Sequence, residues 1–255
     1  MFTALAEEMG AALKRASFSP NIKERRDYSC ALFNPEAAAV SLGDHMPVHL
    51  GAMPMSVEAA LSELGALAPG DVVCLNDPFK GGTHLPDITL ISAIHSSNGR
   101  LLGYVASRAH HSDVGGSTPG SMPLAREIYE EGVRIPPVRL YKEGTRNEDL
   151  WITILANVRT PDERGGDLDA QLAALHTGTT RLLEIAERRG VDETLAAMDA
   201  LIAYADRLVK AGLELIPDGT YHAEDAIEDD GFGSGPVPIK ATMTVAGNSL
   251  TIDFA

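Results

Sequence analysis

Basic residues are scarce in this chain. Lysine and arginine together number 21, against 36 aspartates and glutamates among 255 residues, so the formal net charge is −15 at pH 7. A protein with this excess of negative charge repels phosphate backbones and anionic lipid headgroups. We therefore expect no nucleic acid and no membrane surface among its partners.

Cysteine is also nearly absent. Cys30 and Cys74 are the only two, and their spacing fits neither a zinc knuckle nor a redox pair. Both lie in apolar, strand-like segments, which favours buried free thiols in a reducing compartment. No apolar run approaches the roughly 18 residues of a membrane span, and no signal peptide precedes the first helical pattern. These features predict a cytoplasmic localisation.

Motifs for nucleotide binding and for a serine or cysteine nucleophile are missing as well. The chain contains neither a G-x-x-x-x-G-K-S/T loop nor a G-x-G-x-x-G fingerprint. Ser19 and Ser29 lack the setting of a nucleophile elbow, and Cys30 lacks a basic neighbour that would activate its thiol. If the protein serves an ATP-driven reaction, we expect ATP to be activated elsewhere.

Apolar periodicity predicts an α+β fold with mixed β-sheets. Helical spacing covers residues 2–17, 56–64, 147–157 and 162–215, the last as a long helical hairpin with Asp167 as an N-cap. Short apolar runs between turn signals predict strands at residues 28–33, 38–42, 72–75, 88–94, 101–109, 133–141, 220–227, 239–245 and 250–254. Without a repeat or a linker, the pattern indicates a single large domain over residues 1–255. Its last strand lacks a terminating turn, so we expect truncation at the C-terminus.

Two polar loops carry the residues most typical of a divalent-metal site. The first reads NDPFKGGTHLPD over residues 76–87, and the second reads RAHHSDVGG over residues 108–116. Between them, two β-type segments flank the turn signal SSNG at residues 96–99. A hairpin there would bring His84 and Asp87 near His110 or His111. Because side chains alternate along a strand, only one of the two adjacent histidines should reach the metal.

Other assignments of the same polar residues stay open at this point. The loop histidines can be turn or core residues, and Asp87 can be a surface carboxylate. A second set of polar residues lies nearer the N-terminus and consists of Asp27, Ser29, Asp44, His45 and His49. These residues could supply further metal ligands or a general base, or they could only form hydrogen bonds that stabilise an irregular loop. Arg108 can bind an anionic substrate or form a salt bridge.

The motifs taken together resemble the hydantoinase B/oxoprolinase family. The likeness rests on SPNIKERRDYSCA at residues 19–31, HMPVHLGAMP at residues 45–54, both polar loops, and residues 157–171. It extends over essentially the whole chain. Family members are about twice as long, so the resemblance implies the N-terminal portion of such a protein.

The resemblance also implies a reaction class. It points to a component of an ATP-dependent amidohydrolase that opens a cyclic amide, such as a hydantoin or 5-oxoproline, after a hydantoinase A-like ATPase subunit has phosphorylated the substrate. The implied assembly is a hetero-oligomer. The alternatives are a subunit of an ATP-dependent carboxylase of small ketones and a non-catalytic scaffold.

The metal site implied by the resemblance consists of His84, Asp87 and His110, with His111 in reserve. Manganese, zinc and iron all suit these donors. Asp113 or His49 would then move protons during catalysis.

Overall fold

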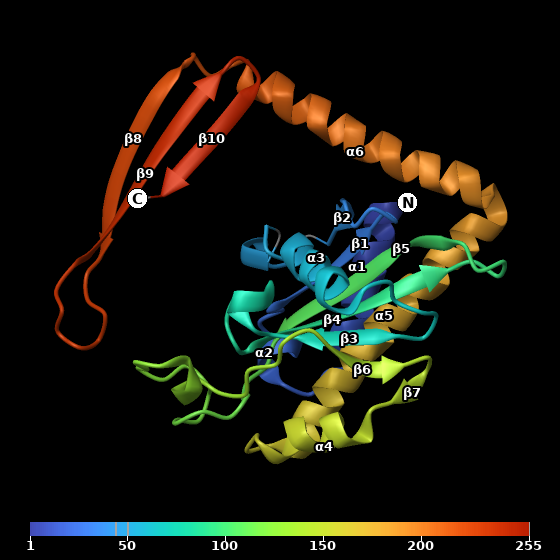
Figure 1. Ribbon diagram of the computed structural model, residues 1–255, viewed down its shortest axis with the longest axis horizontal. Helices are drawn as coiled ribbons and strands as arrows, with labels where there is room; N and C mark the ends of the chain where they lie inside the picture. Colours follow the sequence, from blue (N-terminus) through green and yellow to red (C-terminus); the bar gives the residue numbers. More distant parts are fainter. Residues whose placement is uncertain (44, 50, 255) are drawn as a thin grey trace. The chain divides into compact units, whose positions relative to one another are not determined.

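Two compact units make up the protein. A computed structural model describes residues 1–43, 45–49 and 51–254 (Figure 1), and the chain divides into residues 1–199 and residues 200–255. The sequence had indicated one domain. None of the helices in the described ranges combines the length and the hydropathy that a transmembrane helix needs.

A seven-stranded sheet forms the centre of the first unit. Its order is β2 (Ala39–Leu42), β1 (Tyr28–Phe33), β5 (Leu101–His110), β4 (Asp87–His95), β3 (Val72–Leu75), β6 (Val138–Lys142) and β7 (Thr145–Arg146). All neighbouring strands are antiparallel. The central strands carry apolar runs because both faces of the sheet are covered, and every residue of β1 and β3 is buried. The predicted α+β class is confirmed.

Helices cover the sheet on both faces. On one face, α1 (Phe2–Ala16) and α5 (Pro161–Arg189) pack against each other and contact β1, β4 and β5. On the other, α3 (Met53–Leu64) packs with side chains of β1, β3, β4 and β5 in one apolar cluster (Figure 1). The shorter elements are α2 (Pro20–Lys23), α4 (Glu148–Ala156) and the 3₁₀ turns η1 (Pro47–His49), η2 (Pro78–Lys80) and η3 (Ile128–Glu130).

The long helix α5 buries an apolar stripe against α1 and the sheet. The buried residues of this stripe include Leu168, Leu175 and Leu182. At Gly178 the helices α5 and α1 approach so closely that an added Cβ would lie 2.5 Å from Met9 Sδ. Both helices predicted for this part of the sequence exist, and α5 is followed by α6 (Val191–Leu213).

Two local boundaries also differ from the sequence prediction. Helix α5 begins at Pro161, so Asp167 lies inside it and is not its N-cap; that position belongs to Thr160. The strand expected from residue 133 begins only at Val138. The preceding residues instead exchange hydrogen bonds with Asn76, and Pro136 and Pro137 lack the N–H that a sheet ladder requires.

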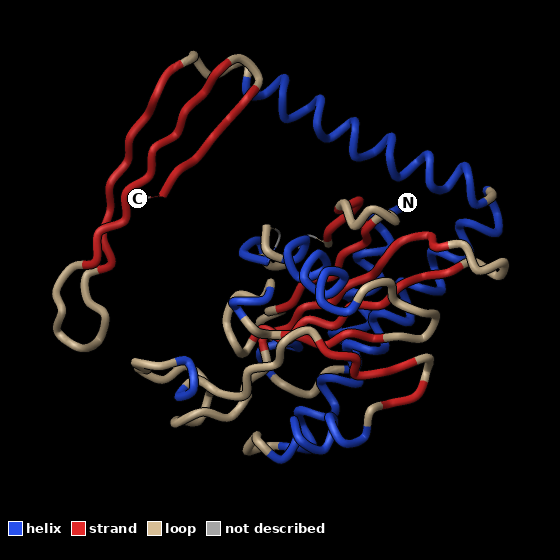
Figure 2. The backbone as a smooth tube through the Cα atoms, in the orientation of Figure 1, coloured by secondary structure: helices blue, strands red, loops and turns tan. Residues whose placement is uncertain are grey.

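The second unit contains the rest of α6 and a three-stranded antiparallel sheet. Its strands β8 (Gly219–Ile227), β9 (Val237–Ala246) and β10 (Ser249–Phe254) lie in the order β10-β9-β8 (Figure 2). The predicted strands are confirmed there. Nearly all their residues are exposed, and Val245 is buried.

Candidate metal centre

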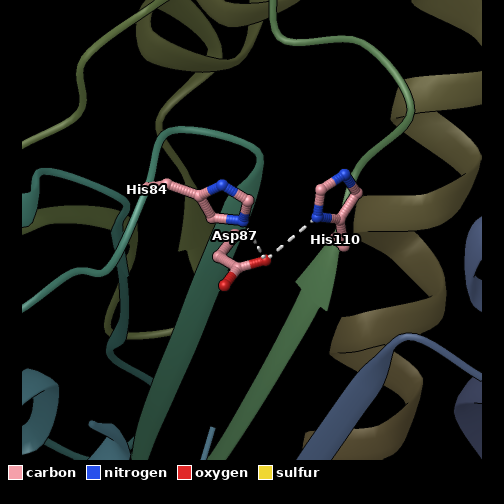
Figure 3. A group of neighbouring side chains, drawn as sticks. All are labelled: His84, Asp87 and His110. Atoms are coloured by element: carbon pink, nitrogen blue, oxygen red, sulfur yellow. Dashed lines mark ion pairs between the residues drawn. The ribbon is translucent and has the colours of Figure 1, made fainter. Parts of the chain in front are cut away.

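The predicted hairpin forms and joins the two polar loops. Strands β4 and β5 pair around the turn at residues 96–99, and their register places Asp87 opposite His110. Asp87 begins β4 and His110 ends β5, while His84 belongs to the loop that leads into β4 (Figure 3). Three residues separated by up to 26 positions in sequence thus meet at one end of the sheet.

The side chains of His84, Asp87 and His110 converge on a common point. One donor atom from each lies within 4.8 Å of the other two. Asp87 Oδ1 is 3.1 Å from His84 Nε2 and 3.4 Å from His110 Nδ1. Asp87 and His110 are buried, whereas the His84 side chain is 40% exposed, so the cluster is reachable from the side of His84.

This donor set fits a divalent cation. Asp87 Oδ1 is buried and has no hydrogen-bond partner among the described residues, although two imidazole nitrogens face it. Such an arrangement leaves lone pairs of nitrogen and oxygen free to share a cation. Two histidines and one carboxylate also leave positions for water or substrate, as a catalytic metal requires.

A second layer of contacts fixes the Asp87 carboxylate. Its Oδ2 accepts a hydrogen bond from Thr83 Oγ1 at 2.8 Å and lies 3.3 Å from His49 Nε2. Burial alone would raise the pKa of Asp87, but the imidazoles of His110, His49 and His84 outweigh burial and hold this pKa far below its usual range. The carboxylate is therefore ionised, as a metal ligand must be.

The second polar set separates into two groups. Asp27 reaches the cluster, with Oδ2 3.8 Å from His110 Nδ1 and Oδ1 3.9 Å from His49 Nε2. His49 is buried, and its Nδ1 lies 3.1 Å from Ser29 Oγ. His45 instead faces Glu7, at 3.5 Å, and the ring of Tyr28. Asp44 lies outside the described residues.

The loop that carries His84 is shaped by Asn76 and by one glycine, Gly81. Asn76 is fully buried; its Nδ2 donates to the carbonyls of Leu85 and Val133, and its Oδ1 accepts from the Ile135 N–H at 2.6 Å. Gly81 has φ +85°, and an added Cβ there would lie 2.6 Å from the Met55 carbonyl oxygen. The loop therefore tolerates only glycine at this point.

His111 lies on the opposite face of the sheet from His110. It is fully buried, and its Nε2 is 2.9 Å from Gln171 Oε1 on α5. The Gln171 amide in turn donates to the carbonyls of Ile88 and Ser107. Burial lowers the pKa of His111 to about 4, so its imidazole is neutral at pH 7. Strand alternation thus places His110, not His111, with His84 and Asp87.

Asp113 forms hydrogen bonds through both carboxylate oxygens. Oδ1 accepts from Arg159 Nη1 at 3.0 Å, from the Gly115 N–H and from Ser121 Oγ, while Oδ2 accepts from the Arg159 N–H. Burial would raise the pKa of Asp113, but these N–H groups and the Arg159 guanidinium outweigh it and lower the pKa. The contacts describe a residue that holds residues 113–121 to the start of α5.

An Asp113→Asn variant is expected to lose stability in a pH-dependent way. Since the folded-state pKa is depressed, the carboxylate stabilises the fold above its unfolded pKa of about 4, and this contribution disappears as pH falls through the lower folded value. The variant should be less stable by about 2 kcal/mol at neutral pH, and the difference should shrink as the pH falls below the unfolded value of about 4. Urea unfolding at several pH values measures this. A constant difference across that range would contradict it.

Arg108 forms no salt bridge among the described residues, and its binding of an anionic substrate stays a prediction. Its guanidinium is fully buried beside the cluster, with Nε 2.9 Å from Thr89 Oγ1 and Nη2 2.6 Å from Ser56 Oγ. Within the described part of the chain, its Nη1 has no hydrogen-bond partner. The hydroxyl groups of Thr89, Ser56 and Thr83 were not identified from the sequence, because isolated hydroxyl residues give no pattern.

Comparison with known proteins assigns the chain to a family. The sequence model described as Hydantoinase B/oxoprolinase matches residues 1–255. Caprolactamase subunit beta from Pseudomonas jessenii is 36% identical over 96% of this chain, which spans 42% of that relative. A crystal structure of the ATP-dependent caprolactamase from the same organism superposes with a TM-score of 0.93, at 34% identity, over 98% of this chain and 44% of that one.

A second solved structure shares the fold. Nucleotide-free acetone carboxylase superposes with a TM-score of 0.86 over 99% of this chain and 36% of its own, at 19% identity. The chain thus spans less than half the length of each of these relatives. Because the family model matches from the first residue to the last, the chain belongs to the hydantoinase B/oxoprolinase family.

Proposed function

We propose that this protein is a component of an ATP-dependent enzyme that opens a cyclic amide, such as a hydantoin or 5-oxoproline. The observation that carries the proposal is the cluster of His84, Asp87 and His110, with its ionised carboxylate and its access from the His84 side. The family description and the likeness to a caprolactamase subunit support the cyclic-amide class.

The cluster would hold a divalent metal, with manganese, zinc and iron as the candidates that suit its donors. When bound, such a metal supplies a Lewis acid that polarises a carbonyl or phosphoryl oxygen. Thr83 and His49 orient Asp87 for this task, and Asp27 lies within reach of the same two imidazoles. His84, the exposed member, borders the space where substrate would enter.

ATP would be used by a hydantoinase A-like partner subunit, which phosphorylates the substrate oxygen before this chain acts. Activation of this kind is required because an unstrained amide hydrolyses very slowly. The ATP dependence and the subunit name of the caprolactamase support a hetero-oligomer. Two buried free thiols, Cys30 and Cys74, suit a reducing compartment such as the cytoplasm, where we place the assembly.

A ketone carboxylase is the second candidate, and the fold shared with acetone carboxylase favours it. The two reactions differ in one co-substrate, because only the carboxylation consumes bicarbonate. We therefore expect the protein, assayed with its ATPase partner and ATP, to open 5-oxoproline or a hydantoin without bicarbonate. The measurement is release of phosphate and of the ring-opened product. Turnover that requires both bicarbonate and a ketone would overturn the hydrolase in favour of the carboxylase.

A further inference from the structure

A groove opens directly beside the candidate metal centre. It has a volume of about 240 Å³ and is lined by His84 and Pro86 of the metal loop, by residues 121–123 and Ala125, and by Glu131. Pockets for drug-sized ligands measure roughly 300–1,000 Å³, so this groove suits a smaller molecule. A substrate held in it would contact the exposed imidazole edge of the metal centre.

Glu131 contributes the carboxylate of this groove. It follows η3 as the helix C-cap and is half-buried. Within the described ranges, its carboxylate forms no hydrogen bond and no ion pair. Glu131 and the exposed imidazole of His84 line the same groove, so a molecule held in it would lie between the carboxylate and the ring.

The other carboxylates near the centre already have fixed partners. Asp113 is held by Arg159, Gly115 and Ser121, and Asp87 by Thr83 and the imidazoles around it. A residue that exchanges protons with substrate must face it and must not be locked in a salt bridge. Asp27 faces His110 and His49 at 3.8 and 3.9 Å and is not part of the groove lining. Of these four carboxylates, Glu131 alone meets both conditions.

We propose that Glu131 is the general acid–base residue of ring opening in this groove. The role rests on the proposed function and extends it. Water attacks the carbonyl carbon of the activated cyclic amide, and Glu131 takes a proton from that water as the new C–O bond forms. The C–N bond then breaks with its electron pair on nitrogen, and Glu131 returns the proton to that nitrogen. The phosphoryl group stays on the product oxygen as an acyl phosphate, which a second water hydrolyses to the carboxylate and free phosphate. The reaction sequence consumes two waters and needs no oxidant or reductant.

The test compares Glu131→Gln with Glu127→Gln in the complex with the ATPase partner. Glu127 is an exposed carboxylate on the other side of the same 3₁₀ turn and is absent from the groove lining. General acid–base catalysis contributes about 10²–10⁴-fold, so kcat on 5-oxoproline should fall by that factor in E131Q and stay unchanged in E127Q. The metal content and the binding of 2-pyrrolidinone, measured by saturation-transfer NMR, should remain as in the wild type.

If Glu131 had only a structural role, its replacement would change the metal content or the melting temperature. If E131Q loses metal or melts well below the wild type, Glu131→Asp decides the question: a shortened carboxylate should keep the fold, retain part of kcat and shift the pH profile of kcat. A wild-type complex that opens neither 5-oxoproline nor hydantoin overturns the proposed function together with this role. An active wild type with an equally active E131Q, or with an E131D that shows no change in its pH profile, overturns only the role of Glu131.

Discussion

Replacing Asp87 with asparagine is expected to weaken divalent-metal binding by at least 100-fold. Asp87 Oδ1 is the one anionic donor of the three-residue cluster, and both imidazole nitrogens face it at 3.1 and 3.4 Å. Loss of an outer partner of a metal ligand alone costs on the order of 10–100-fold in affinity, so loss of the charged ligand should cost more. The variant keeps the shape of the side chain, which separates the effect of charge from that of packing.

Metal content and metal-dependent stability measure this change independently of any substrate. Wild-type protein dialysed against manganese, zinc or iron should retain about one equivalent, and an excess of 100 times the Kd should stabilise it by about 2.7 kcal/mol. Asp87→Asn and His84→Ala should show neither effect. His176→Ala, which removes an exposed histidine of α5, is the matched control and should behave as the wild type. Wild-type protein that binds no divalent metal would instead favour a scaffold.

The local geometry of the cluster followed from the sequence because it depends on a short hairpin. The turn at residues 96–99 fixes the pairing of the adjacent strands, and the two-residue period of a strand then separates His110 from His111. Both steps use only nearby residues. Short apolar runs bounded by turn residues likewise located β3, β4 and the three strands of the second unit.

Contacts between distant segments were not predictable in this way. Asp27 and His49 reach the cluster because β1 pairs with β5 and η1 follows the β1–β2 hairpin, and no spacing in the sequence encodes those pairings. Glu131 arrives through an irregular loop that has no periodic signal. The apolar stripe of α5 indicates that one face of the helix is covered but not by which element, and in the structure α1 and the sheet cover it.

Replacing Asp167 with alanine is expected to destabilise the first unit by about 3–5 kcal/mol, the usual effect of removing one member of a buried ion pair. Asp167 is fully buried, and its Oδ2 lies 3.0 Å from Nη2 of Arg164, which is also buried. Its Oδ1 accepts the N–H groups of Phe18 and Ser19, the residues that lead from α1 toward Asp27. The variant therefore leaves a buried cation and two unpaired N–H groups.

Urea unfolding of a double-variant cycle separates these two contributions. In Asp167→Ala the buried Arg164 keeps its ion pair with Glu163 but loses the buried carboxylate. Adding Arg164→Met removes this cation and should restore part of the lost stability, whereas the N–H groups of Phe18 and Ser19 remain unsatisfied in both variants. Asp169→Asn, an exposed carboxylate two residues along the same helix, should change stability by no more than about 0.5 kcal/mol. Equal stabilities of Asp167→Ala and the double variant would mean that the buried charge costs nothing, and the loss would then belong to the α1–α5 connection alone.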